Sequence, residues 1–561
     1  MAQNKSTLPK FHLAAPGWVA LVVLVVALVI SPIAVVLSSI FSDTGSTWNH
    51  LASTVLPTYV MNSLGLMVGT TVGVIVIGVG TAWLVTMCRF PGDRIFEWAL
   101  LLPLAAPAYL LAYAYTDVLD YYGWVQAGLR SLFGWERATD YWFPDVRSIG
   151  GAIVMFSATL YPYVYMLTRV AFMEQSTATL EASRVLGCGP WRSFLTVALP
   201  MARPAIMAGL SLALMETLSD FGTVDYFGVQ TFTTGIYRTW FSLGERITAA
   251  QLAAVLMLFI FVLIVLERWS RRQARYYQSG GQVNSSHRHR LKGWRGLLAA
   301  AACVVPIAVG LLIPGGFLLT MALRHLDETL DRNFLPLVEH SLILATLTAA
   351  IAVVMSVILA YGVRLQNLPI MRAGVRVASM GYAVPGSVIA VGILIPIARI
   401  DNAIADWAEQ MLGISLGLLI SGTITALIFA YLVRFLAVSL SAIESGLGKI
   451  RPSLDDAARS LGHTPTATLK TIHVPLMASS LLTAAMLVFV DVMKELPATL
   501  VMRPFNFDTL AVQVYQYASD ERLVEASAPA LMIILVGLLP VIFLSWQVAL
   551  NSNYSLTSEW L

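Results

Sequence analysis

The chain is built from long apolar blocks separated by short polar segments, and each block is long enough to cross a bilayer as a helix. A membrane helix needs about 20 consecutive, mostly apolar residues. The ~10-residue segments of alternating apolar and polar positions that are typical of membrane strands do not occur. We therefore expect an all-α polytopic membrane protein with about 12 transmembrane helices. The pattern predicts spans at 18–40, 60–88, 95–118, 148–170, 201–222, 248–267, 296–323, 340–363, 374–399, 412–434, 476–501 and 527–548.

The composition agrees with a membrane protein, and the basic residues indicate its orientation. Of 561 residues, 57% are hydrophobic and 12% are charged, whereas soluble domains carry about 25% charged residues. If the N-terminus is cytoplasmic, the cytoplasmic segments hold 24 Lys and Arg residues and the opposite side holds 10. Since short cytoplasmic loops of membrane proteins are enriched in Lys and Arg, we expect both termini to be cytoplasmic.

An internal duplication divides the chain into two halves. With a shift of 278 residues, the region from Ser63 to Pro107 aligns without a gap with the region from Ser341 to Pro385. Further along, a shift of 275 aligns "EASRVLGCGPWRSFLTVALP" (181–200) with "DAARSLGHTPTATLKTIHVP" (456–475). A six-helix unit is therefore expected twice. Because six spans return the chain to the same side, the two units are parallel, as in a 6+6 repeat.

The halves are expected at residues 1–267 and 296–561, joined by a linker at 268–295. This linker region carries eight basic residues among Gly, Ser and Asn, with no apolar period. Such a segment is typical of a cytoplasmic linker held at the anionic headgroups of membrane lipids. We interpret it in this way rather than as a nucleic-acid-binding patch.

Two classes of transporter have a parallel 6+6 arrangement: secondary carriers of the major-facilitator type and importer permeases with two fused membrane subunits. "RFPGDR" (89–94) is the one feature that favours a carrier, but its counterpart "NLPIMR" (367–372) has no Gly-Asp. Since Pro, Gly and Asp are the residues that form tight turns, we interpret the first segment as a turn.

The duplicated polar segments lie in long loops, at 170–200 and 435–475, on the side that the charge count assigns to the cytoplasm. Each begins a short helix with a carboxylate near its N-terminus, continues with small residues and reaches a helix-breaking glycine. Such a loop can present a rigid helix to another protein. These segments resemble the EAA loops of ABC-importer permeases. The matching residues are Glu181, Ala182, Gly187 and Pro200 in the first half, and Asp456, Ala457, Gly462 and Pro475 in the second.

In that family, the EAA loop forms a coupling helix that sits in a cleft of a cytoplasmic ATPase. The resemblance implies that this chain, with both loops, assembles with two copies of a separate ABC ATPase. The chain itself has no Gly-x-x-x-x-Gly-Lys-Ser/Thr loop to hold nucleotide phosphates, and its three cysteines lack metal-type spacing. We expect a permease rather than an enzyme, with no cofactor bound by this chain, no assigned metal site, and ATP on the partner subunit.

Five ionisable residues interrupt the apolar run at equivalent places in the two halves. The 275-residue shift brings Glu216 onto Asp491 and Asp220 onto Glu495, whereas Lys494 corresponds to a serine. Residues at i and i+4 share one helix face, so four carboxylates are expected to converge. Lys494 is expected to pair with Asp491 or to face the acids of the other half. Such charges either lock the helices together or line a translocation path, because intramembrane charges face the protein interior or water.

The segments around these residues, 215–241 and 490–520, look like the fused permeases of bacterial ferric-iron ABC importers. The resemblance implies an inner-membrane permease that receives ferric iron from a periplasmic substrate-binding protein and alternates its access as the ATPases close. Clustered carboxylate oxygens suit a hard cation. Fused thiamine permeases share the layout, and polyamine and sulfate permeases share the EAA loop. These cargoes stay open, as does an ATP-independent secondary carrier.

Overall fold

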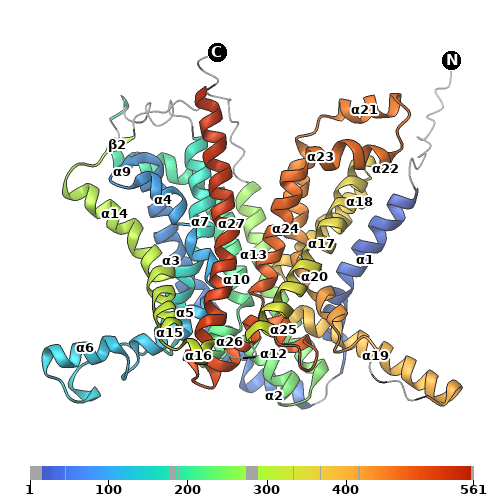
Figure 1. The fold of residues 1–561 in the computed structure, drawn as a ribbon, viewed down its shortest axis with the longest axis horizontal. Coiled ribbons are helices and arrows are strands. Elements are labelled where there is room, and N and C mark those ends of the chain that lie inside the picture. The colour runs from blue at the N-terminus through green and yellow to red at the C-terminus, as the bar shows by residue number, and fades with distance from the viewer. Residues whose placement is uncertain are drawn as a thin grey trace.

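A computed structural model describes residues 16–43, 46–175, 183, 185–187, 189–272, 288–330, 332, 334–366, 368–414, 417 and 419–557. Ten helices in this part of the chain are long and apolar enough to cross a membrane, or up to twelve if each of two sharply bent pairs is one span. The expected all-α polytopic architecture is thereby confirmed. In Figure 1, the start of α1, the end of α27 and helix α21 lie at one edge of the molecule, with α6, α16 and α12 at the opposite edge.

The helices of the first half are α1 (Pro16–Ser38), α2 (Ser46–Thr54), α3 (Leu56–Met87), α4 (Asp93–Ala99), α5 (Ala108–Leu119), α6 (Trp124–Phe133), α7 (Ile149–Glu174), α9 (Pro190–Ser193), α10 (Leu199–Ser219), α11 (Gly222–Tyr226), α12 (Phe232–Phe241) and α13 (Arg246–Arg272). Short 3-10 turns, η1 (Ser39–Phe41), η2 (Leu102–Ala105) and η3 (Ala138–Asp140), and a π-helical turn, η4 (Phe194–Ala198), connect some of them.

The helices of the second half are α14 (Trp294–Ile307), α15 (Ile313–Arg324), α16 (Leu326–Thr329), α17 (Phe334–Leu365), α18 (Pro369–Ala378), α19 (Gly386–Leu412), α20 (Ile424–Gly448), α21 (Pro452–Ser460), α22 (Pro465–Thr468), α23 (Val474–Leu476), α24 (Ala478–Met493), α25 (Pro497–Met502), α26 (Leu510–Ser519) and α27 (Leu523–Thr557). The 3-10 turn η6 (Ser379–Ala383) and the π-helical turns η5 (Ala308–Leu312) and η7 (Leu469–His473) complete this half.

Several predicted spans are not single straight helices. The predicted span 95–118 is divided between α4 and α5, and the helical segments Asp93–Ala105 and Ala108–Phe133 are bent by 88° relative to each other. Helix α24 is bent by 78° relative to the helical segment Pro465–Leu476 before it. The predicted span 374–399 is likewise divided between α18, η6 and α19. Prolines explain two of the breaks. Pro107 and Pro385, which the repeat aligns, directly precede α5 and α19. The residues before them, Ala106 and Val384, have extended backbones, because the proline ring disfavours helix at the preceding residue.

One predicted span is misplaced along the chain. The span expected at 412–434 is α20, which runs from Ile424 to Gly448, and the Thr423 side chain caps its N-terminus by accepting a hydrogen bond from Ala426 N. Ser148 caps α7 in the same way, 275 residues earlier. The apolar residues just before Thr423 belong to a turn that contains Gly422 in the left-handed region, with φ of +72°. Their hydrophobicity caused the error.

Small residues bring the helices of the first half together. Gly69 and Gly73 of α3 face Ile153 and Ser157 of α7, and a Cβ atom at Gly73 would overlap the Ser157 hydroxyl. Spacing of small residues by four positions lets two membrane helices approach closely, so that van der Waals packing stabilises the pair.

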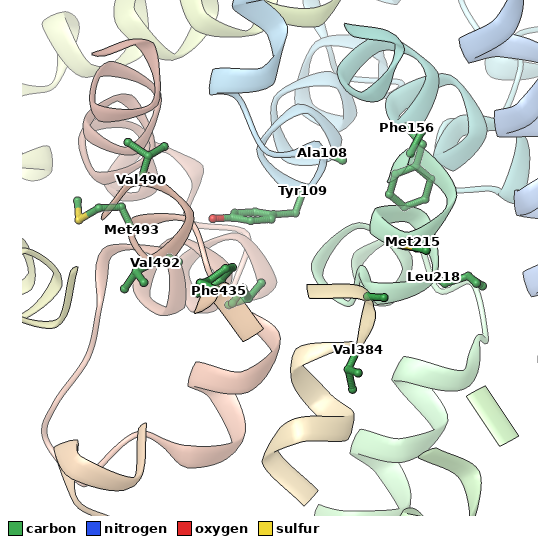
Figure 2. Packing of buried hydrophobic residues seen from close by; sticks show 14 of the residues in the cluster. Ala108, Tyr109, Phe156, Met215, Leu218, Val384, Phe435, Val490, Val492 and Met493 are labelled. Carbon is green, nitrogen blue, oxygen red and sulfur yellow. The ribbon is translucent and has the colours of Figure 1, made fainter. Parts of the chain in front are cut away.

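The two halves exchange their first helices. Helix α1 packs against α17, α18 and α19 of the second half, whereas α14 and α15 pack against α3, α4 and α5 of the first half. At the centre, buried side chains from both halves form one cluster. Figure 2 shows Tyr109 of α5 pointing toward Val490 and Met493 of α24. The two halves therefore share one hydrophobic cluster.

The end of the linker packs against the first half of the chain. Strand β2 (His289–Arg290) pairs in parallel with β1 (Cys88–Arg89), and the Arg288 guanidinium lies 3.3 Å from Asp93 and 3.2 Å from Glu97. The predicted Pro-Gly-Asp turn is confirmed, since Gly92 has a φ of +82° and Asp93 N donates to Phe90 O. This turn holds the end of the linker.

Candidate functional site

A cavity of about 110 Å³ lies between the two halves, where α10 and α24 end. It is lined by main-chain and side-chain atoms from α5, α7, α10, η6, α20 and α24. The charged residues around it are Glu216, Asp220, Arg434, Asp491, Lys494 and Glu495, and the tyrosines are Tyr109, Tyr163 and Tyr382. All five ionisable residues that the sequence singled out therefore meet at one cavity.

The outer carboxylates, Asp220 and Glu495, do not lie on the same continuous helix as their partners four residues earlier. Helix α10 ends at Ser219 and α24 ends at Met493, and a short second helix follows each break. The prediction that each pair shares one helix face is thus wrong. Non-helical backbone at membrane depth is tolerated only where it is buried in protein or lines a water-filled cavity, and both breaks lie at the cavity.

These outer carboxylates support the helix that follows each break. Asp220 accepts hydrogen bonds from the Thr223 and Val224 amides at 2.9 and 3.2 Å and from the Thr223 hydroxyl at 3.1 Å. Glu495 accepts from the amides of Ala498 and Thr499 at 2.9 and 3.0 Å, and from the Thr499 hydroxyl at 2.6 Å. A carboxylate at a helix N-terminus satisfies amides that have no partner within the helix. The same structural support is thus present in both halves.

The inner carboxylates, Glu216 and Asp491, are partly exposed, as is Asp220 of the outer pair, whereas Glu495 is buried. The exposed fraction of the Glu216 side chain is 28% and that of Asp491 is 15%, against 1% for Glu495. Lys494 Nζ lies 2.9 Å from Asp491 Oδ1, so the predicted pairing is confirmed. Because they have no helix to cap, the inner pair can interact with a solute in the cavity.

Arg434 of α20 is the site residue that sequence reasoning missed. Its Nη1 lies 3.1 Å from Glu495 Oε1 and its Nη2 lies 3.9 Å from Glu216 Oε2, so one guanidinium joins carboxylates of both halves. The predicted span 412–434 has this residue at its very end, where an arginine is expected to face the membrane surface rather than the interior. The signal was available: the apolar run continues after Arg434 as "FLAVSLSAI", which would have placed it within a span.

The charges around the cavity do not form a metal cage. Four carboxylates face two cationic side chains, leaving an excess of negative charge if all are ionised. Within the described residues, no group of three or more His, Cys, Asp or Glu side chains could hold a metal ion. The Tyr109 hydroxyl is buried and has no hydrogen-bond partner. The cavity therefore offers separated oxygen atoms, which suit transient contacts with a solute.

The halves are joined on the side of the cavity away from α21, where α12, α25 and α26 lie (Figure 1). The Tyr515 hydroxyl donates to Asp225 Oδ2 at 2.7 Å, and the rings of Phe221 and Tyr515 are 5.6 Å apart. Arg147 and Glu521 also approach to 3.9 Å across this interface. These contacts join first-half and second-half residues on that side of the molecule.

The proposed coupling residues lie at the opposite end, as far as the structure describes them. Glu181 and Ala182 fall outside the described residues. Gly187 and Gly462 have φ of +84° and +82°, in the left-handed region that ends many helices at a glycine. The residues just before them, Leu186 and Leu461, are 83% and 79% exposed.

In the second half, Asp456 and Ala457 are exposed on α21, and Pro475 lies in α23. In the first half, Pro200 lies in the first turn of α10. Helices α21 and α9 are well separated along the same edge of the molecule (Figure 1). The two loops thus offer two separate exposed surfaces on one side of the membrane domain.

Residues 74–276 and 352–553 each match the family described as the binding-protein-dependent transport system inner membrane component. The chain is 25% identical over 498 residues to the Fe(3+)-transport system permease protein FbpB 2 of Haemophilus influenzae, covering 86% of this chain and 88% of that protein. It is 28% identical over 206 residues to the molybdenum transport system permease protein ModB of Escherichia coli, covering 35% of this chain and 86% of ModB. It is 29% identical over 175 residues to the putative 2-aminoethylphosphonate transport system permease protein PhnU of Salmonella choleraesuis, covering 31% of this chain and 60% of PhnU.

Proposed function

Since this chain belongs to the binding-protein-dependent transport system inner membrane component family, with the family's region present twice, we propose that it is a fused two-half permease of an ATP-driven importer. Both exposed loops come from one polypeptide, so two copies of a separate ABC ATPase would complete the complex. A periplasmic substrate-binding protein would deliver the cargo to the opposite side. In this arrangement the edge with α21 and both chain termini faces the cytoplasm.

The proposed cargo is ferric iron. The relative named for Fe(3+) transport aligns with 86% of the chain, whereas those named for molybdenum and 2-aminoethylphosphonate align with 35% and 31%. The observation that carries the proposal is the charge of the cavity, where four carboxylates outnumber two cationic side chains. Hard oxygen atoms and excess negative charge favour a hard cation and disfavour an anion.

In the proposed mechanism, the carboxylates have two distinct tasks. Asp220 and Glu495 hold the broken helices through their hydrogen bonds to backbone amides. Glu216 and Asp491 contact the passing cation, because their side chains face the cavity and cap no helix. The ion does not need a resident site. Weak contacts with separated oxygens allow it to enter and leave, as conduction requires.

Alternating access would use the interface between the halves. The contacts of Tyr515 with Asp225 and Phe221 hold the two halves together on the proposed periplasmic side in this conformation. ATP-driven closure of the ATPases on the loops would draw the cytoplasmic ends together and release these contacts. Cargo would then enter from the binding protein. Return to the present arrangement would let it leave toward the cytoplasm.

The test is uptake of radiolabelled ferric iron into proteoliposomes that hold the chain assembled with its ATPase, with ATP enclosed on the ATPase side and the binding protein added outside. The double variant Glu216→Gln with Asp491→Asn is expected to abolish uptake while it still folds and co-purifies with the ATPase. Glu409→Gln, an acid exposed on α19 away from the cavity, is the matched control and should transport normally. Normal uptake by the double variant would contradict the proposed path, and loss of folded protein would favour a purely structural role.

The alternative cargoes, thiamine and polyamines, are organic cations that the same acidic cavity could attract. Competition with ferric uptake by each of these compounds distinguishes them from iron. The alternative class, an ATP-independent secondary carrier, predicts uptake driven by an ion gradient without nucleotide. Replacement of both Gly187 and Gly462 by valine should abolish ATP-dependent uptake by a permease but leave a carrier's activity intact.

A further inference from the structure

Arg364, at the end of α17, binds three separate parts of the second half. Its Nε and Nη2 lie 2.8 and 2.7 Å from Asp455 Oδ2 in the first turn of α21. Its Nη1 donates to Leu447 O at 2.7 Å, and its Nη2 donates to Ile450 O at 3.0 Å. The last carbonyls of a helix have no partner within it, so the guanidinium caps α20 while it holds α21.

Neighbouring side chains strengthen this attachment. His473 is fully buried, and its Nε2 lies 2.7 Å from Asp455 Oδ1 without the geometry of a hydrogen bond, so the imidazole packs against the carboxylate that Arg364 holds. The Tyr361 hydroxyl, one turn before Arg364 on α17, donates to Pro465 O at 2.8 Å. The Tyr361 and His473 rings meet edge to face at 5.2 Å. The exposed helix α21 is thus fastened on both of its flanks to α17.

The first half lacks each of these polar groups at the aligned positions. Thr86 stands in place of Arg364, Trp83 in place of Tyr361, Leu180 in place of Asp455 and Ala198 in place of His473. Trp83 packs instead on Phe172 and Phe194, with ring centroids 5.5 and 4.6 Å apart. No threonine, leucine or alanine can replace a planar guanidinium that donates to several acceptors at once.

Helix α20 continues from this attachment to the cavity. Its last carbonyls are held by Arg364, and in its middle Arg434 holds Glu216 and Glu495. The first-half position aligned with Arg434 is Thr159, whose hydroxyl donates to a carbonyl of its own helix. In the second half, arginines thus hold α20 near its end and in its middle, whereas α7 of the first half has Thr159 in its middle and, near its end, a different ion pair between Arg169 and Glu97.

We propose that Arg364 is a positioning residue that connects the second coupling helix to the cavity through α20, so that the two halves transmit ATPase movement unequally. Force on α21 reaches α17 and α20 through Asp455 and Arg364, and α20 carries it to Arg434. The first half has Thr86, Leu180 and Ala198 at the positions aligned with Arg364, Asp455 and His473, so this particular charged link is not repeated there. The transport part of this inference rests on the proposed function, whereas the attachment of α21 does not.

Hydrogen–deuterium exchange of the purified full-length chain in nanodiscs tests the attachment without ATPase or cargo. In Arg364→Met, backbone amides of residues 452–463 should exchange faster by about tenfold or more, because several hydrogen bonds to α21 and α20 are lost. Thr86→Val, at the aligned first-half position, is the matched control and should leave these amides unchanged. Unchanged exchange in Arg364→Met would overturn the proposal.

Transmission is tested with the assembled complex, by measuring ferric ion taken up per ATP hydrolysed. Arg364→Met should still co-purify with the ATPase and hydrolyse ATP, with uptake per ATP lower by about tenfold, as expected for a lost coupling of moderate strength. Arg364→Lys should be intermediate, since lysine keeps the charge but not the fork of donors. If Arg364→Met does not fold, Asp455→Asn, which keeps the shape of the side chain, should give the same two effects more weakly.

Each outcome bears on a different statement. Faster exchange with normal uptake per ATP would overturn transmission through Arg364, although α21 would still be fastened there. Equal loss of coupling in Thr86→Val and Arg364→Met would overturn the inequality of the halves. Absence of ATP-dependent ferric uptake in the unsubstituted complex would contradict the proposed function, while the exchange measurement would still decide whether α21 is fastened.

Discussion

Removal of the Arg434 side chain is expected to destabilise the membrane domain by about 3 kcal/mol, at the lower end of the cost of breaking a buried ion pair. The exposed fractions of the Arg434 and Glu495 side chains are 8% and 1%, and their charged atoms are 3.1 Å apart. Without Arg434, the Glu495 carboxylate stays buried with no cation beside it. The cost is at the lower end because Glu495 keeps three hydrogen bonds from Ala498 and Thr499, at 2.6 to 3.0 Å.

A second substitution separates the stranded charge from lost packing. In Arg434→Met with Glu495→Gln, the buried charge is removed together with its partner, so the double variant should regain about 1 kcal/mol or more relative to Arg434→Met alone. Lys494→Met is the comparison in a less buried pair, because Asp491 faces the cavity and is 15% exposed. It should lose less stability than Arg434→Met.

The measurement is the thermal unfolding midpoint of each variant in the same detergent, followed by tryptophan fluorescence and by the loss of the monodisperse peak in size-exclusion chromatography. The expected order of stability is unsubstituted chain, Lys494→Met, double variant and Arg434→Met. A double variant that unfolds at or below the temperature of Arg434→Met would refute the reasoning, because the loss would then come from packing and not from an unpaired carboxylate.

Three further substitutions test the packing of the helices and loops. Gly73→Ala should destabilise the α3–α7 contact by about 1–3 kcal/mol because the new methyl group overlaps Ser157, whereas Gly80→Ala, with open space around it, should be neutral in the same unfolding assay. Gly462→Val should reduce ATP-dependent uptake while Gly462→Asn retains most of it, since asparagine tolerates the left-handed φ of +82° that valine does not; equal activity of the two variants would contradict this. Thr499→Val removes hydrogen bonds of 2.6 Å to Glu495 and to Tyr431, and its unfolding midpoint should fall by an amount that corresponds to about 1–3 kcal/mol.

The sequence was sufficient for the features that depend on hydrophobic pattern and on repetition. Apolar blocks of bilayer length predict the spans, and the alignment of Glu216 with Asp491 predicts that charges from both halves meet at the centre. Glycine placement is equally informative, because Gly187 and Gly462 each need the left-handed region. These features are local or are encoded twice, so one chain without relatives is enough to recognise them.

Other features depend on which donor and acceptor groups form hydrogen bonds with each other in the folded chain, and sequence reasoning missed them. A carboxylate four residues after another is compatible with one helix face, yet Asp220 and Glu495 cap new helices because the amides after the breaks need acceptors. Arg434 was placed at a helix end because a glycine-containing turn before it is as apolar as a span. Tertiary hydrogen bonding decides both cases, and hydrophobic periodicity does not contain that information.

Comparison of the two repeats distinguishes the charged residues of the cavity that both halves have from those that only one half has. Asp220 and Glu495 occupy aligned positions and make the same hydrogen bonds, as expected for groups that every broken helix of this type needs. The cationic residues Arg434 and Lys494 have no aligned counterpart, since Thr159 and Ser219 stand there. A group required only to stabilise the repeated fold would be needed in both halves. The two cations therefore point to tasks that the halves do not share. Of the two inner acids, Glu216 is held less tightly: it lies 3.9 Å from Arg434, whereas Asp491 lies 2.9 Å from Lys494. We expect a cation that enters the cavity to contact Glu216 first.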